Sequence, residues 1–246
     1  MARKELDHFY IENSYGGNQD WFRSFMMRLG GCGAETACDS SIYFALHRGI
    51  TAAYPFDAHN LTRKDYVDFA HIMEKYLWPR MSGIDRLDIF TEWYGKYLAD
   101  RGVDSIAMDK LDGTESYEAA AAAIKSQIDA GWPVPTLILN HRDRAYSDYN
   151  WHWFLINGYD GRSAGGSVDI GDGGSGKRSD GGSGERGVDG SGERSDDGSA
   201  GGLNGDQTPS MLVKAVTYSS YRWLDLGKLW DTGHIRRGGL VLFREK

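Results

Sequence analysis

Apolar side chains recur three or four residues apart through the first half of the chain, which is the spacing of one face of an α-helix. Thr62 is a typical N-cap for one such segment, with Asp65 three residues later, and Thr114 or Ser116 is suited to cap another. The pattern predicts four helices, over residues 31–49, 63–78, 83–102 and 114–131.

After residue 131 the pattern changes to short apolar or β-branched runs separated by turn residues. These runs predict strands over residues 133–139, 151–159, 211–220 and 238–243. A helical half, residues 1–131, followed by a strand-rich half, residues 132–246, is typical of an α+β fold. A chain of 246 residues can bury a sizeable core, and we expect a single domain.

One segment, residues 161–206, interrupts the strand-rich half. It consists mostly of Gly, Ser, Asp, Glu and Arg, and it holds 17 of the 33 glycines. Because it has almost no large apolar side chains, ordering it would cost conformational entropy with little burial to compensate. We therefore predict that residues 161–206 form a flexible insertion.

The charge and hydropathy of the chain narrow the function classes. A net charge of −7 argues against nucleic acid or an anionic membrane as the main partner. No run approaches the ~18 apolar residues of a membrane span. The first residues, MARKELDHFYIENSY, lack the apolar core of a secretory signal. We therefore expect a cytoplasmic protein with no nucleic-acid or membrane partner.

The two cysteines, Cys32 and Cys38, are six residues apart. On one helix their Cα atoms would lie ~9 Å from each other, beyond the reach of a disulfide bond. The spacing also differs from that of zinc ligands. We therefore expect two free thiols, and neither a metal nor a cofactor.

Cys32 stands between Gly31 and Gly33 at the start of the first predicted helix. Unpaired N–H groups and the helix dipole favour an anion there, which lowers a thiol pKa. The glycines would let a substrate backbone approach, and the Cys32 amide could face a developing oxyanion. The alternative is a buried structural cysteine, an interpretation that suits Cys38 in the middle of the helix.

A thiolate nucleophile needs a base, and His152 is the best candidate. It lies on a predicted strand, between two tryptophans and on the same face as Phe154 and Ile156. A histidine on a rigid strand can accept the proton of a nearby thiol. The alternative is a histidine without a functional partner, which suits the other six histidines better.

The segments that carry these residues resemble a known family. GGCGAETACD and WHWFLINGYDG are similar to the papain-like cysteine peptidases, most closely the bacteriocin-processing branch. GGNQDWF, YPFDAHNLT and LWDTG resemble uncharacterised bacterial proteins of the same superfamily. The resemblance implies Cys32 as nucleophile, His152 as base and the Gln19 side chain as oxyanion donor. It also implies a helical amino-terminal lobe packed on an antiparallel sheet lobe, with the cleft between them.

The chain departs from the family at two positions. Gln19 stands thirteen residues before Cys32, farther than the family glutamine from its cysteine, so Asn18 is an alternative donor. The family also has an Asn or Asp on the strand after the histidine. Here the matching stretch offers Thr217, whose hydroxyl could accept an Nδ1–H bond, and Asp160 and Asp225 are the alternatives.

These residues predict a cysteine-dependent hydrolase that cleaves a peptide or amide bond in a peptide or protein substrate through an acyl-enzyme. An acyltransferase could use the same Cys-His pair and pass the acyl group to an amine. A non-catalytic peptide-binding protein is the alternative from another class, with contacts from Trp21, Phe22, Trp151 and Trp153.

Overall fold

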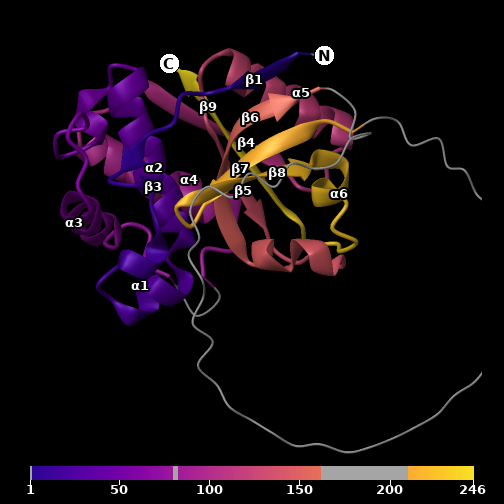
Figure 1. The fold of residues 1–246 in the computed structure, drawn as a ribbon, viewed down its shortest axis with the longest axis horizontal. Helices are drawn as coiled ribbons and strands as arrows, with labels where there is room; N and C mark the ends of the chain where they lie inside the picture. The colour runs from indigo at the N-terminus through magenta and orange to yellow at the C-terminus, as the bar shows by residue number, and fades with distance from the viewer. Residues whose placement is uncertain (1, 80–82, 162–209) are drawn as a thin grey trace, which may run out of the picture.

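The computed structural model describes residues 2–79, 83–161 and 210–246. Figure 1 shows the first helices gathered on one side, with β3 (Ser14–Tyr15) beside them, and the strands of the large sheet on the other. In chain order the strands, helices and 3-10 helices (η) are β1 (Arg3–Glu5), β2 (Tyr10–Ile11), β3 (Ser14–Tyr15), η1 (Gln19–Trp21), α1 (Phe25–Gly30), α2 (Cys32–His47), η2 (Thr51–Ala53), α3 (Arg63–Met73), α4 (Leu87–Asp100), β4 (Ile106–Asp112), α5 (Tyr117–Asp129), β5 (Val134–Ile138), η3 (Arg144–Tyr149), β6 (His152–Asp160), β7 (Leu212–Thr217), β8 (Ser220–Asp225), α6 (Leu226–Trp230) and β9 (Gly238–Glu245).

Among the described residues, seven strands form one antiparallel sheet: six lie in the order β4-β9-β5-β6-β7-β8, and β1 is the seventh. β1 pairs with the end of β6 that lies beyond β5, with Arg3 opposite Asp160. β2 and β3 form a separate two-stranded hairpin. The predicted α+β fold with an antiparallel sheet is therefore confirmed.

α2 is almost completely enclosed by the rest of the protein. Fourteen of its 16 residues are buried, including the polar residues Glu35 and Asp39. It packs against β6, whose Trp153 stacks on Phe90 of α4 with ring centroids 4.4 Å apart. A helix enclosed in this way must find partners for its polar side chains inside the protein.

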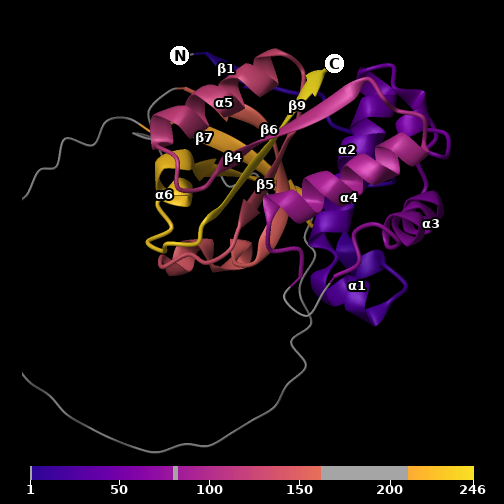
Figure 2. The ribbon, with the colours of Figure 1, turned by 180° about the vertical axis from the view of Figure 1, so that it is seen from behind.

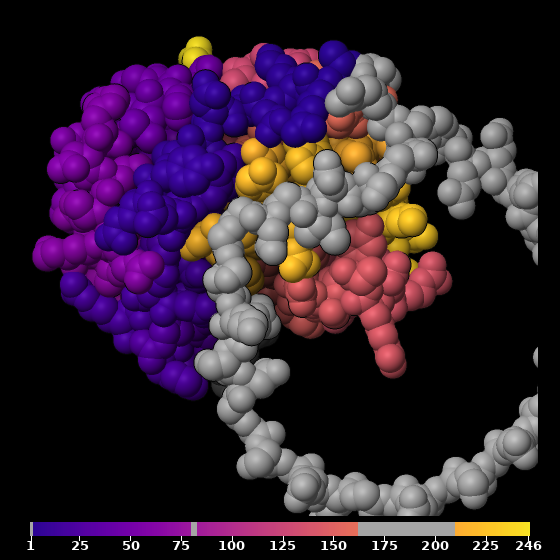
Figure 3. All heavy atoms as spheres, in the orientation of Figure 1, coloured from indigo at the N-terminus to yellow at the C-terminus, as the bar shows by residue number. Residues whose placement is uncertain are grey.

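The helices and the sheet share one core. A continuous cluster of buried side chains joins them, and within it Phe44 of α2 meets Phe243 of β9 edge-on, with centroids 4.9 Å apart. Seen from behind, α5 lies over the sheet (Figure 2). The space-filling view shows the first and second halves of the chain in direct contact (Figure 3). The helix that begins with Cys32 and the strand that begins with His152 therefore belong to one packed body.

The four predicted helices are confirmed as α2, α3, α4 and α5, with shorter ends than predicted. The Thr62 hydroxyl accepts the Asp65 N–H at 3.0 Å, as expected, and Ser116 rather than Thr114 caps α5. β4 was not predicted, and it lies inside the expected helical half, paired with β9. As an edge strand it is partly exposed, and charged residues interrupt its apolar alternation.

Residues 162–206 of the predicted insertion lie outside the described residues. The strands on either side of it, β6 and β7, are antiparallel neighbours, with Asp160 opposite Leu212. Within the described ranges, no helix combines the length and the apolar character that a membrane span requires.

Candidate functional site

Cys32 is the first residue of α2, as predicted, and Gly31 before it is the N-cap residue. The Cys32 side chain is buried, and its Sγ lies 4.0 Å from the carbonyl oxygen of Trp151, the residue before His152. Cys32 and Cys38 are both free thiols, as expected. The thiol at the start of α2 therefore lies against the beginning of β6.

The electrostatic environment of Cys32 differs from the expected one. Burial raises the pKa of Cys32 to about 11; a backbone hydrogen bond with Trp153 acts against this rise, and the charge of Glu35 adds to it. Desolvation disfavours a thiolate more than the start of the helix favours it. The resting thiol is therefore protonated near neutral pH, and attack requires a base that removes the proton.

The glycines beside Cys32 serve packing within the protein. A Cβ atom at Gly31 would lie 2.2 Å from the carbonyl oxygen of Met27, which no side chain can accommodate. A Cβ atom at Gly33 would lie 3.3 Å from the Ile84 side chain. We expected a substrate backbone to approach these glycines closely. Instead, atoms of Met27 and Ile84 occupy the space beside them.

His152 begins β6, and only 4% of the residue is exposed. Its Nε2 lies 2.8 Å from Oγ1 of Thr217 at the end of the neighbouring strand β7. The structure thus brings Thr217 to His152, as the order of the strands suggested. The contact is at Nε2, however, and not at the Nδ1 that we expected.

Tyr218 adds a contact that the sequence pattern did not indicate. Its ring stacks on the imidazole of His152, with centroids 4.9 Å apart and ring planes 4° apart. Stacking against a flat neighbour restricts rotation of the imidazole. Together, Thr217 and Tyr218 fix both the direction and the plane of the His152 ring.

The two acidic alternatives to Thr217 lie elsewhere. Asp160 is at the opposite end of β6, eight residues from His152, which is roughly 26 Å at the usual rise of a strand. Asp225 is the N-cap of α6, where its Oδ1 accepts the N–H of Lys228 at 3.0 Å. Neither carboxylate can orient the imidazole.

Gln19 lies in η1 and is 4% exposed. Its Nε2 donates to the carbonyl oxygen of Arg28 at 2.8 Å, whereas its Oε1 is buried and has no hydrogen-bond partner. The side-chain amide has two protons, so the second is the one that an oxyanion donor would use. Asn18, the alternative donor, caps η1 by accepting the N–H of Asp20 at 2.8 Å.

The structure also brings Glu35 to this region, which the sequence analysis missed. Its Oε2 accepts the N–H of Gln19 and its Oε1 accepts the N–H of Tyr218, each at 3.1 Å. Burial, followed by the charge of Asp39, raises the pKa of Glu35 to about 8. A signal was present in the sequence, because these two acidic residues stand three and seven residues after Cys32 in a helix of mostly small or apolar residues.

Comparison of the chain with protein-family models, curated proteins and solved structures finds no match. Among the described residues, no three His, Cys, Asp or Glu side chains are grouped as a metal site would require. What this region does must therefore be inferred from the arrangement of Cys32, His152, Thr217 and Gln19.

Proposed function

We propose that the protein is a papain-like cysteine hydrolase that cleaves a peptide or amide bond. The observation that carries the proposal is the contact of the Cys32 thiol with the backbone at the start of β6, where Thr217 holds His152. A thiol at a helix start beside a strand-borne, oriented imidazole is the arrangement that a cysteine nucleophile needs. The helices packed on an antiparallel sheet are compatible with a papain-like architecture.

In this mechanism His152 is the base. When Nε2 carries the proton and donates it to the Thr217 hydroxyl, the lone pair of the neutral imidazole lies on Nδ1. Nδ1 takes the thiol proton while Sγ forms a bond to the carbonyl carbon of the substrate. The electron pair of the carbonyl moves to its oxygen, which gives a tetrahedral oxyanion.

The N–H of Cys32 and the amide of Gln19 are the donors that would stabilise this oxyanion. Collapse of the intermediate breaks the C–N bond, and the leaving amine receives the proton from His152. Water, deprotonated by His152, then attacks the thioester and releases the acid, which restores the thiol.

A peptide-binding protein without catalysis is the second candidate. Two observations favour it: the buried thiol has a pKa of about 11, and exposed apolar side chains flank the site in the chain. Leu29, shortly before Cys32, is 69% exposed, and Trp151, before His152, is 45% exposed. Exposed apolar side chains of this kind suit a peptide ligand, whether or not the ligand is cleaved.

A peptide library separates these functions when it is incubated with the wild type and with Cys32→Ala. We expect cleavage by the wild type alone, together with an adduct on Cys32 when an electrophilic peptide probe is added. Equal binding without cleavage by both proteins would assign the binding function. Products that carry an added amine in place of water would assign an acyltransferase.

A further inference from the structure

Glu35 is a buried acidic side chain, only 3% exposed, on the helix that begins with Cys32. Residues three apart on a helix lie on the same side, so Glu35 stands one turn below the thiol. Burying a carboxyl group is costly unless hydrogen bonds compensate for the lost water. The partners of Glu35 therefore indicate why the chain keeps an acid at this position.

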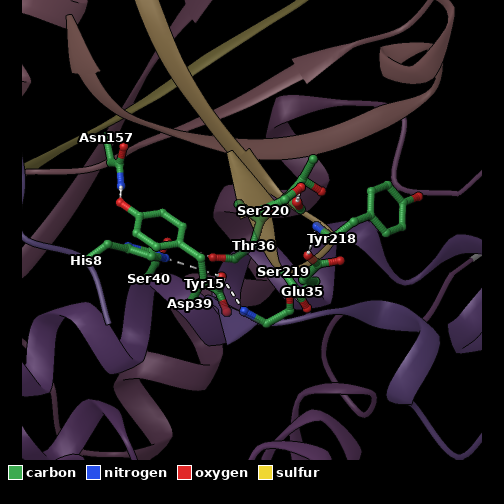
Figure 4. Close-up of polar contacts among 12 residues, drawn as sticks. His8, Tyr15, Glu35, Thr36, Asp39, Ser40, Asn157, Tyr218, Ser219 and Ser220 are labelled. Atoms are coloured by element: carbon green, nitrogen blue, oxygen red, sulfur yellow. Dashed lines mark hydrogen bonds and ion pairs between the residues drawn. The ribbon is translucent and has the colours of Figure 1, made fainter. Parts of the chain in front are cut away.

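Both carboxyl oxygens of Glu35 accept a backbone N–H, and the two donors come from opposite ends of the chain. Oε2 accepts from Gln19 in η1 and Oε1 accepts from Tyr218 after β7, each at 3.1 Å. Figure 4 shows Glu35 of α2 directed toward the turn that carries Tyr218 and Ser219. One side chain thus links the helix, the oxyanion segment and the strand end that orients the base.

The turn that Glu35 contacts is unfavourable on its own. Thr217 pairs with Ser220, so Tyr218 and Ser219 are the two central residues between β7 and β8. Their φ angles are 50° and 59°, a left-handed backbone that non-glycine residues rarely adopt. The turn therefore depends on contacts with the rest of the protein, and one of these is the Glu35 bond to α2.

The same turn is held to the segment before Gln19 as well. Ser219 donates its N–H to the carbonyl oxygen of Gly17 at 2.8 Å, and its own carbonyl oxygen accepts the N–H of Tyr15 at 3.2 Å. These two bonds join the segment and the turn into one unit. Glu35 and Asp39 of α2 both bond this unit: Glu35 accepts from Gln19 and Tyr218, and Asp39 accepts from Gly17.

We propose that Glu35 is a positioning residue: it fixes Gln19 and the Thr217–Tyr218 corner to the helix that carries Cys32. The nucleophile, the base and the oxyanion donor are thereby held at constant distances from one another. The catalytic consequence of this role rests on the proposed function, whereas the role itself concerns only the geometry around His152. Positioning errors of about 1 Å can cost 100-fold in rate.

Asp39, one turn farther along α2, is a matched control. It is buried like Glu35, and its carboxyl oxygens accept the N–H of Gly17 at 3.1 Å and the hydroxyl of Tyr66 at 2.8 Å. Its bonds go to Gly17 and Tyr66, whereas those of Glu35 go to Gln19 and to Tyr218, the residue stacked on His152. Asp39→Asn should therefore lower stability and disturb the imidazole less than Glu35→Gln does.

The test compares Glu35→Gln with Asp39→Asn by NMR of the ¹⁵N-labelled histidine rings. Glutamine keeps the shape but presents an NH₂ group to one of the two backbone N–H donors, so one bond is lost. We expect Glu35→Gln to shift the ¹⁵N signals of His152 and its titration midpoint, and to lower kcat about 10- to 100-fold with KM changed less than about threefold. Asp39→Asn should shift the His152 signals less than Glu35→Gln does and keep kcat within about threefold. His152 signals that are unchanged in Glu35→Gln, or shifted equally in both variants, would overturn the proposal.

A measurement on the wild type keeps the proposal testable if Glu35→Gln does not fold. The amide protons of Gln19 and Tyr218 should titrate with the same midpoint as the ¹³Cδ of Glu35, whereas Gly17 should follow the ¹³Cγ of Asp39. Different midpoints for Gln19 and Tyr218 would contradict the shared bond. If the NMR results are as expected and the wild type cleaves no peptide, the proposed function fails and the positioning role stands.

Discussion

Cys32 and Cys38 lie on the same helix and differ mainly in what faces them. Both are buried, and burial raises the pKa of both thiols. Both belong to the same apolar core, but the Cys32 thiol also contacts the carbonyl oxygen of Trp151, the residue before His152. The pKa is thus raised at both thiols and does not distinguish the candidate nucleophile from the structural thiol. What distinguishes Cys32 is its contact with the backbone next to His152, the proposed base.

The largest difference should come from removing each thiol in turn. Cys32→Ala should lower cleavage by at least about 1,000-fold, because the nucleophile is lost, with little change in Tm. Cys38→Ala should keep activity within about threefold and lose about 1–2 kcal/mol of stability through the cavity that it leaves. Peptide cleavage and urea unfolding measure the two effects. Loss of activity in a folded Cys38→Ala protein would reverse the assignment.

Changing the group that orients His152 should have a smaller effect. Thr217→Val keeps the shape of the side chain but removes the acceptor at Nε2, so kcat should fall about tenfold. Thr217→Asn should retain or raise the rate, whereas His152→Ala should abolish it. Steady-state kinetics at several pH values measure these effects. An unchanged rate in Thr217→Val would show that another group orients the ring.

The two thiols should also differ in labelling. Since the pKa of Cys32 is about 11, its reaction with iodoacetamide should be slow at neutral pH. The labelling rate should increase about tenfold per pH unit until the pH reaches the pKa. Cys32 should nevertheless react before Cys38, which is 0% exposed. Peptide mapping by mass spectrometry identifies the labelled residue. Earlier labelling of Cys38 would show that access to the start of α2 is blocked.

The acidic residues of α2 should make stability depend on pH. Burial raises the pKa of Glu35 to about 8 and that of Asp39 to about 7, above the ordinary values of 4.5 and 3.8. The folded state thus favours the protonated forms of both carboxyl groups. Their contribution to the free energy of unfolding is full below about pH 4 and is lost as the pH rises through 7 to 8. Tm of the wild type should fall from pH 5 to pH 8.5, and less so in the Glu35→Gln and Asp39→Asn double variant. An equal fall in both proteins would place the source elsewhere.

The smallest effect is expected from replacing residues 162–209 with a short Gly-Ser turn. β6 and β7 are antiparallel neighbours, which a short turn can join. Each doubling of a loop costs only about 0.6 kcal/mol of closure entropy, so Tm and the labelling of both thiols should be almost unchanged. Scanning calorimetry checks this. A large drop in Tm would mean that the segment contributes to the fold.

The helices and central strands could be predicted because each carries a local signal. The Thr62 cap, the helix start at Cys32 and the strand that begins at His152 all follow from the pattern within a few residues. β4 could not be predicted in this way, because an edge strand with charged residues lacks a clear period and gains its partner only from β9. Pairing between distant segments is invisible to a local pattern.

The candidate site also has features that the local sequence indicates and features that depend on packing. The sequence alone indicated the candidate nucleophile, the candidate base and Thr217, because each stands in a recognisable place in its own element. Only the tertiary structure decided that desolvation outweighs the helix start at Cys32, and that Thr217 meets Nε2 rather than Nδ1. It alone also showed that Glu35 joins Gln19 to Tyr218. Burial and hydrogen bonds between distant segments arise only when the chain packs, and they set the electrostatics of the site.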